Sequence, residues 1–209
     1  MRVSEDRYSR DLGKLNLAKR FIDHGLRTYW ILLFTGMTED QLRNLLRSYF
    51  GGPVLQRHRG NPPMSLAKLF RAPLKGEAAA LAGMVKVLRL VPAVPVRSVR
   101  DLLPDIHWGE RLCAVFELFQ IGAPGAVISM DVMMLIVSAI AEGRLTLGRC
   151  MKCQGTILVD PLAGRRPVCE ACDLYRAWGK GKAVVVPRAK DLQGLPTPAE
   201  WAEEQQSLF

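Results

Sequence analysis

Apolar side chains recur every three or four residues through most of the first 143 residues, which is the period of an amphipathic α-helix. The pattern predicts helices over residues 11–24, 26–35, 38–50, 65–72, 77–90, 110–120 and 129–142. The period changes to alternation at 144–148 and to a short apolar run at 155–159, which predicts two β-strands. We therefore expect a mostly α fold, with a helical domain followed by a small module.

The second predicted helix, 26–35, is almost entirely apolar and contains Tyr29, Trp30 and Phe34. A helix that is apolar on every side is buried, either in the core or against another protein. We interpret these three aromatic residues as a candidate partner interface, although a stripe of this composition is also typical of a simple core.

The third predicted helix has a clear beginning and two distinct faces. Thr38 and Gln41 form a capping box, in which each side chain bonds the backbone of the other. Arg43, Asn44 and Arg47 share the face opposite the apolar stripe. A helix, a glycine turn and a second polar helix over 26–50 indicate a helix-turn-helix-like hairpin, whose second helix enters the major groove of DNA. Arg and Asn can read guanine and adenine there; an ordinary helical hairpin with a solvated face is the alternative.

The composition favours a polyanionic partner, either nucleic acid or an anionic membrane surface, and of these we expect nucleic acid. The chain has 209 residues, a net charge of +9 and a pI near 9.6. The longest apolar stretch, 127–141, is interrupted by Asp131 and is too short to span a bilayer. The first residues are charged, without the apolar region of a secretory leader. We therefore expect a cytoplasmic protein that does not bind membranes.

The pattern of chemically active residues does not favour an enzyme. The sequence has no phosphate-binding glycine loop and no Gly-x-Ser-x-Gly motif, and His24, His58 and His107 lack metal-hydrolase spacing. A metal-dependent or redox enzyme remains a further hypothesis, although a less favoured one.

Four of the five cysteines form two Cys-x-x-Cys pairs separated by fifteen residues: Cys150, Cys153, Cys169 and Cys172. This spacing fits a structural zinc site with four thiolate ligands, in which no coordination position stays open for a substrate. We expect each pair to form a tight turn and Zn²⁺ to be the cofactor, although iron suits the same ligands. The fifth cysteine, Cys113, lies in an apolar run and is predicted to be a buried free thiol, which suits a reducing compartment.

The predicted zinc-ribbon-like module, 144–190, follows the helical domain, 1–143, and precedes a tail, 191–209, in which an acidic helix is expected after Thr197. The module is rich in basic residues. We interpret these as candidate DNA phosphate contacts: Lys152, Arg165, Arg166, Arg176, Lys180 and Lys182.

Two blocks of the sequence together resemble the FlhC family, the larger subunit of the flagellar master transcriptional activator. The first, 22–51, includes Gly25, Arg27, the Thr38 cap and Gly51, and is followed by a proline-rich loop. The second, 142–172, runs from Glu142-Gly-Arg-Leu-Thr-Leu147 into the two cysteine pairs. Residues 66–125 match only as a helical segment, and no resemblance extends beyond residue 190.

The resemblance implies a zinc-binding, mostly helical transcription activator. Proteins of this family act with a small helical partner, FlhD, in a hetero-oligomer that binds double-stranded promoter DNA and engages RNA polymerase. It also implies that the four cysteines are the zinc ligands. Related activators control flagellum biogenesis or the conjugative transfer of mobile elements, and the residues do not separate these roles. The alternative class is a zinc-ribbon RNA-binding or ribosome-associated protein.

Overall fold

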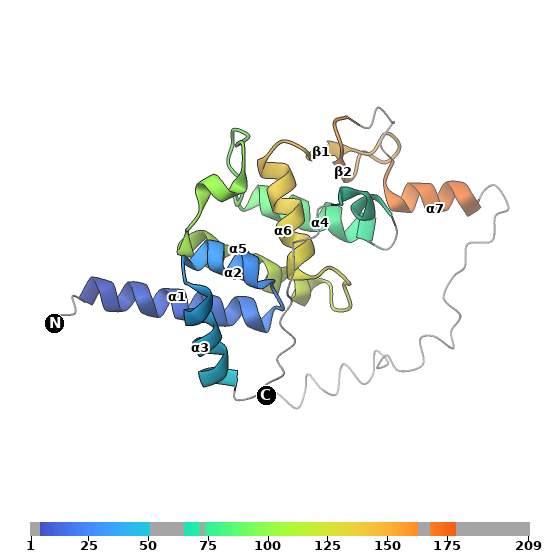
Figure 1. Cartoon of the computed structure of the whole chain (residues 1–209). Helices are drawn as coiled ribbons and strands as arrows, with labels where there is room; N and C mark the ends of the chain where they lie inside the picture. Colours follow the sequence, from blue (N-terminus) through green and yellow to red (C-terminus); the bar gives the residue numbers. More distant parts are fainter. Residues whose placement is uncertain (1–4, 51–64, 72–73, 163–167, 179–209) are drawn as a thin grey trace, which may run out of the picture. The chain divides into compact units, whose positions relative to one another are not determined.

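The computed structural model describes residues 5–50, 65–71, 74–162 and 168–178 (Figure 1). The chain divides into two compact units, Met1–Glu170 and Ala171–Phe209. Within the second unit, only the helix that begins at Glu170 is described. The boundaries expected after residues 143 and 190 stay predictions.

The first unit is mostly helical, as predicted. Its helices and short 3-10 helices (η) are α1 Glu5–Asp23, α2 Thr28–Thr35, α3 Glu39–Phe50, η1 Leu66–Phe70, α4 Leu74–Val87, η2 Val99–Leu102, α5 Ile106–Gly122 and α6 Met130–Ala141. Strands β1 Thr146–Arg149 and β2 Thr156–Val159 form an antiparallel hairpin, with Leu147 opposite Leu158. These two strands confirm the prediction made from the change of hydrophobic pattern after residue 143.

Helices α1, α2 and α5 meet in an aromatic core. The rings of Phe21 and Phe34 are 5.2 Å apart, and Phe34 lies 5.4 Å from Trp108. The indole of Trp108 donates a hydrogen bond to the Leu90 carbonyl at 2.7 Å, which satisfies its polar group inside the core. Gly109 lets α1 approach α5 closely, because a Cβ added there would lie 2.6 Å from a methyl group of Leu17.

A polar network joins α1 to α5 beside this core. Arg20 bonds both carboxylate oxygens of Glu117 at 2.9 Å and pairs with Glu110, while His24 bonds Glu117 at 2.9 Å. Burial alone would raise the pKa of Glu117, but hydrogen bonds from His24 and Arg20 outweigh it and hold the pKa below its usual value. Cys113 is fully buried nearby, as predicted, and burial raises the pKa of its thiol to about 12.

Helix α6 runs through the centre of the unit, and most of its side chains are buried. Asp131, in its first turn, accepts hydrogen bonds from the backbone N–H of Arg27 at 3.2 Å and from the guanidinium Nε at 3.0 Å. Because Arg27 is the N-cap of α2, this pair fixes α2 to α6. Leu145 and Leu158 join the same core, so the hairpin is anchored to the helices.

The predicted partner interface on α2 requires a correction. The side chains of Trp30 and Phe34 are 6% and 0% exposed, so both belong to the core of this chain and present no surface to another protein. Tyr29 is half-buried, and the guanidinium of Arg100 lies over its ring, 5.2 Å from the centroid. The apolar stripe therefore has the simpler role of core formation.

Candidate metal centre and nucleic-acid face

The first cysteine pair lies at the turn between β1 and β2. Strand pairing ends at Arg149 and Thr156, and the turn is closed by hydrogen bonds from Cys150 N to Gly155 O at 2.8 Å and from Gln154 N to Cys150 O at 3.0 Å. Gln154 has a left-handed backbone, with φ of 61°. This tight turn, which was predicted, directs Cys150 and Cys153 to the same side.

The second cysteine pair differs from the prediction of a tight turn, because it begins helix α7, Glu170–Trp178. Cys169 directly precedes the helix, and Cys172 lies in its first turn. Residues three apart on a helix project from the same face, so a helical start also brings two sulfur atoms together.

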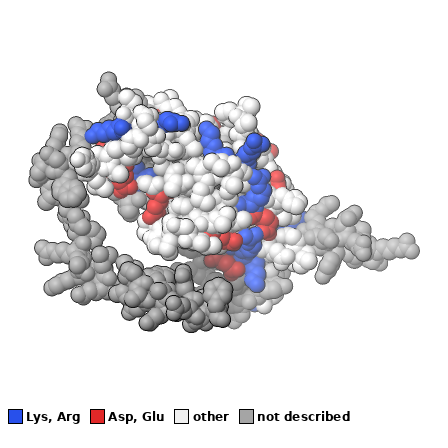
Figure 2. All heavy atoms as spheres, turned by 180° about the vertical axis from the view of Figure 1, so that it is seen from behind, with Lys and Arg blue, Asp and Glu red and all other residues white. Residues whose placement is uncertain are grey.

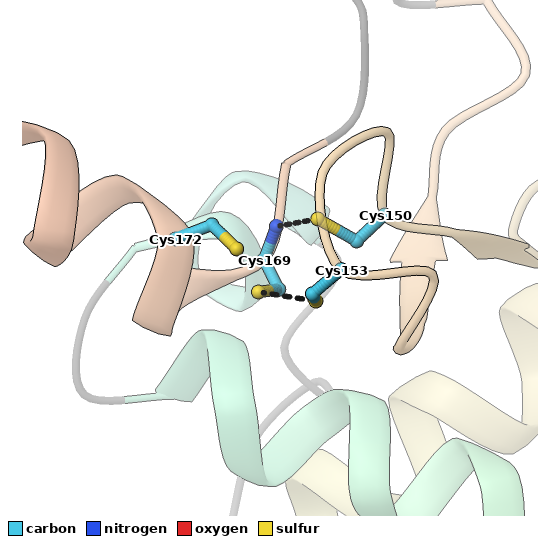
Figure 3. Close-up of side chains that lie close together, drawn as sticks. All are labelled: Cys150, Cys153, Cys169 and Cys172. Atoms are coloured by element: carbon cyan, nitrogen blue, oxygen red, sulfur yellow. Dashed lines mark hydrogen bonds between the residues drawn. The ribbon is translucent and has the colours of Figure 1, made fainter.

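The four thiol sulfurs converge, as the close-up shows (Figure 3). Their Sγ atoms all lie within 4.8 Å of one another, and those of Cys153 and Cys169 are 3.6 Å apart. A tetrahedral ion with metal–sulfur bonds of about 2.3 Å requires sulfur–sulfur distances of about 3.8 Å. The cluster therefore has the donor set and nearly the dimensions to hold one metal ion.

Backbone amides favour the ionised form of Cys150, the most buried thiol of the four-cysteine cluster. Cys150 is fully buried, and its Sγ accepts hydrogen bonds from the backbone N–H groups of Cys169 at 3.3 Å and Lys152 at 3.4 Å. Together with the N–H of Cys153, the strongest contributor, these donors outweigh burial and lower the pKa of Cys150 to about 6. A thiolate at neutral pH is the form that binds a metal. The chemistry of the donor set suits zinc, and iron accepts the same four sulfurs.

Helix α3 presents the predicted nucleic-acid face. Thr38 N donates to Gln41 Oε1 at 2.9 Å and Gln41 N donates to Thr38 Oγ1 at 3.3 Å, which confirms the capping box. Leu42 and Leu45 are buried on the inner side of the helix.

The three predicted base-reading residues, Arg43, Asn44 and Arg47, are exposed on the outer side of α3. Arg43 pairs with Asp40 at 2.8 Å on the helix surface. Such exposed pairs contribute little energy, so the guanidinium can exchange this partner for a phosphate or a base.

The other predicted phosphate contacts are only partly described. Lys152 is exposed at the first cysteine pair, where its own backbone N–H bonds Cys150. Arg165, Arg166, Lys180 and Lys182 lie outside the described residues, and so does the side chain of Arg176 on α7.

A hollow of about 430 Å³, which the sequence pattern does not predict, lies between α1 and α3. Asp11 and Lys14 of α1 and Asn44 and Ser48 of α3 line it. The hollow places Lys14 beside the outer face of α3, a position that the local helical pattern of α1 could not reveal.

Charge on the face of the molecule in Figure 2 is mixed. Lys and Arg side chains gather along one edge of this face, with Asp and Glu between them. Acidic side chains thus interrupt the row of basic ones, and this face does not form a continuous positive surface. Among the described residues, no helix is long and apolar enough to cross a membrane.

No protein-family model matches this chain, and no curated protein has significant sequence similarity to it.

Proposed function

We propose that this chain is a DNA-binding subunit of an FlhC-like transcription activator, which works at promoters in a hetero-oligomer with a small FlhD-like helical protein. The observation that carries the proposal is the geometry of α3. A capping box fixes its start, two leucines bury its inner side, and Arg43, Asn44 and Arg47 extend from its outer side. These side chain types can form paired hydrogen bonds with base edges in the major groove.

The four-cysteine cluster has a supporting role in this proposal. We assign Zn²⁺ to it, as a structural ion that keeps the β1–β2 turn and the start of α7 together. Lys152, whose backbone bonds a ligand sulfur, then contributes a phosphate contact. The proposal gives the chain no catalytic role and places it in the cytoplasm, where it engages RNA polymerase at flagellar or transfer promoters.

Salt dependence of DNA binding tests the proposal. The full chain is purified with the FlhD-like protein encoded nearest to its gene, and binding to upstream promoter fragments is measured by fluorescence anisotropy over a range of salt concentrations. Protein cations that contact phosphates release counterions, so the logarithm of the association constant should fall steeply with the logarithm of salt concentration. Flat salt dependence, or equal affinity for all fragments at every salt concentration, contradicts the proposal.

Substitutions on α3 distinguish base reading from simple charge. Arg47→Ala should cost about 1–3 kcal/mol on the preferred promoter and relax its sequence preference. Lys152→Ala should weaken binding to all sequences alike and reduce the salt slope by about one. Arg97→Ala is the matched control, because Arg97 is an exposed cation on a different part of the first unit. If all three variants behave alike, α3 does not read bases.

The nucleic acid that co-purifies with the chain distinguishes the proposed function from the alternative, RNA binding. A zinc-ribbon RNA-binding protein would retain ribosomal RNA through purification and would prefer it to promoter DNA in competition. That outcome would replace the activator proposal.

A further inference from the structure

A second pocket, separate from the four cysteines, lies where α4 and α6 end and β1 begins. Its volume is about 550 Å³. Small-molecule sites in proteins commonly measure about 300–1,000 Å³. Its walls are mainly apolar and include Val91, Pro92, Pro95, Ile140 and Leu145. The pocket can therefore enclose the apolar body of a small ligand.

Two cations lie at this pocket, and none of the described residues that line it carries a carboxylate. Lys86 and Arg89 are exposed and belong to its lining. Neither forms an ion pair with any residue in the part of the chain that the structure describes. The pocket consequently offers positive charge that no residue in the described part of the chain neutralises.

The backbone at Arg89 adds an independent observation. Helix α4 ends with hydrogen bonds from Leu90 N to Val85 O at 2.9 Å and from Arg89 N to Lys86 O at 3.1 Å. This is the Schellman arrangement, which places Arg89 at a position with left-handed backbone where glycine is usual. Arg89 adopts φ of 52°, a conformation that is unfavourable for a residue with a side chain. An arginine at a glycine position keeps a guanidinium at the pocket despite this strain.

We propose that this pocket binds an amphipathic anion, namely a small molecule with an apolar body and one anionic headgroup, either a carboxylate or a phosphate. The apolar walls take the body, and Lys86 and Arg89 bind the headgroup. Guanidinium groups bind both kinds of headgroup with paired hydrogen bonds. The site does not depend on the function proposed above.

The pocket lies against strand β1, which leads into the first cysteine pair. Thr146 and Leu147 of β1 form part of its lining, and the same strand leads directly into Cys150. A ligand would therefore contact strand β1, directly before the first cysteine pair, and its binding would stabilise the folded strand by mass action.

Methyl and amide NMR spectra of the full-length chain test the proposal. The probes are sodium decanoate and decyl phosphate, with decan-1-ol as the uncharged control, all below their aggregation concentrations. At least one anion should cause saturable shifts at Ile140, Leu145 and Leu147, whereas decan-1-ol should not. Equal binding of decan-1-ol, shifts confined to other regions or no binding of either anion overturns the proposal.

Variants of the two cations separate ligand binding from stability. Arg89→Gly should weaken binding of the anion about tenfold through loss of a charge-assisted hydrogen bond. Its thermal midpoint should not fall, because glycine accepts the left-handed backbone. Lys86→Gln should also weaken binding, and Lys68→Gln, an exposed lysine on η1, should leave it unchanged. Retained affinity in Arg89→Gly and Lys86→Gln contradicts the assignment.

Discussion

The close approach of α1 and α5 at Gly109 predicts that a single methyl group there destabilises the protein. In Gly109→Ala, the new Cβ would lie 2.6 Å and 3.1 Å from the two methyl carbons of Leu17 and 3.2 Å from Phe21 Cζ. Leu17 and Phe21 are fully buried, so neither can move away without disturbing its neighbours. Overpacking of this kind costs about 1–3 kcal/mol. The better helix propensity of alanine returns about 1 kcal/mol, which leaves a net loss of up to about 2 kcal/mol.

Urea denaturation followed by circular dichroism measures this loss, and Gly83→Ala supplies a matched control. Gly83 lies within α4, and a Cβ added there meets no atom within 4 Å. The same substitution should therefore stabilise the protein by about 1 kcal/mol, through helix propensity alone. For a chain of this size, a net loss of about 1 kcal/mol in Gly109→Ala should lower the thermal midpoint by about 3 °C. If Gly109→Ala is as stable as Gly83→Ala, α1 and α5 do not pack as tightly as described.

Three further predictions concern the metal cluster, the polar network and the α3 cap. Cys150→Ser should abolish binding of one metal ion per chain and unfold the β1–β2 turn, with loss of DNA binding as a consequence. Cys113→Ser, the control, should retain the metal. Elemental analysis and promoter binding check both variants, and full DNA affinity without metal would limit the ion to a stabilising role. Glu117→Gln should lower the free energy of unfolding by about 1 kcal/mol at neutral pH. The pKa of Glu117 is lowered in the folded state, so its contribution to stability is complete above the unfolded pKa of about 4.3 and is lost as the pH falls through the folded pKa. The difference in stability between Glu117→Gln and wild type should therefore disappear in unfolding curves measured at acid pH. Thr38→Ala should cost about 1 kcal/mol in urea denaturation, and an unchanged midpoint would mean that the capping box contributes no stability.

Local signals were sufficient to predict α3, because its capping box acts over only three residues. Helix α5 begins at Ile106 rather than at the predicted residue 110. Asp105 caps it, because its carboxylate accepts a hydrogen bond from the backbone N–H of Trp108 at 2.9 Å. Gly109 lowers the local helix propensity, but a residue without a side chain is required there by the close contact with α1. A local cap and a tertiary contact thus set this boundary together, and helix propensity alone did not indicate it.

The cysteine cluster was predictable from spacing alone, but the geometry of its second half was not. A Cys-x-x-Cys pair fits both a hairpin turn and the first turn of a helix, and the sequence around Cys169 allows either. The same limit applies to Trp30 and Phe34, since periodicity identifies an apolar stripe without showing what covers it. The contacts of Arg20 with Glu117 join residues far apart in the chain, so no local pattern could have predicted them.

The contact between Arg27 and Asp131 governs how the protein can be divided. It joins residues 104 positions apart, and the ring of Phe34 on α2 rests against Trp108, which is also remote in the chain. During synthesis, α2 therefore leaves the ribosome long before the residues that cover it, and it acquires its final position only once α6 has emerged. A recombinant fragment that ends after α3 would retain every candidate base-reading residue and yet expose its aromatic core to water. A fragment made to test the proposed DNA binding must consequently extend through α6.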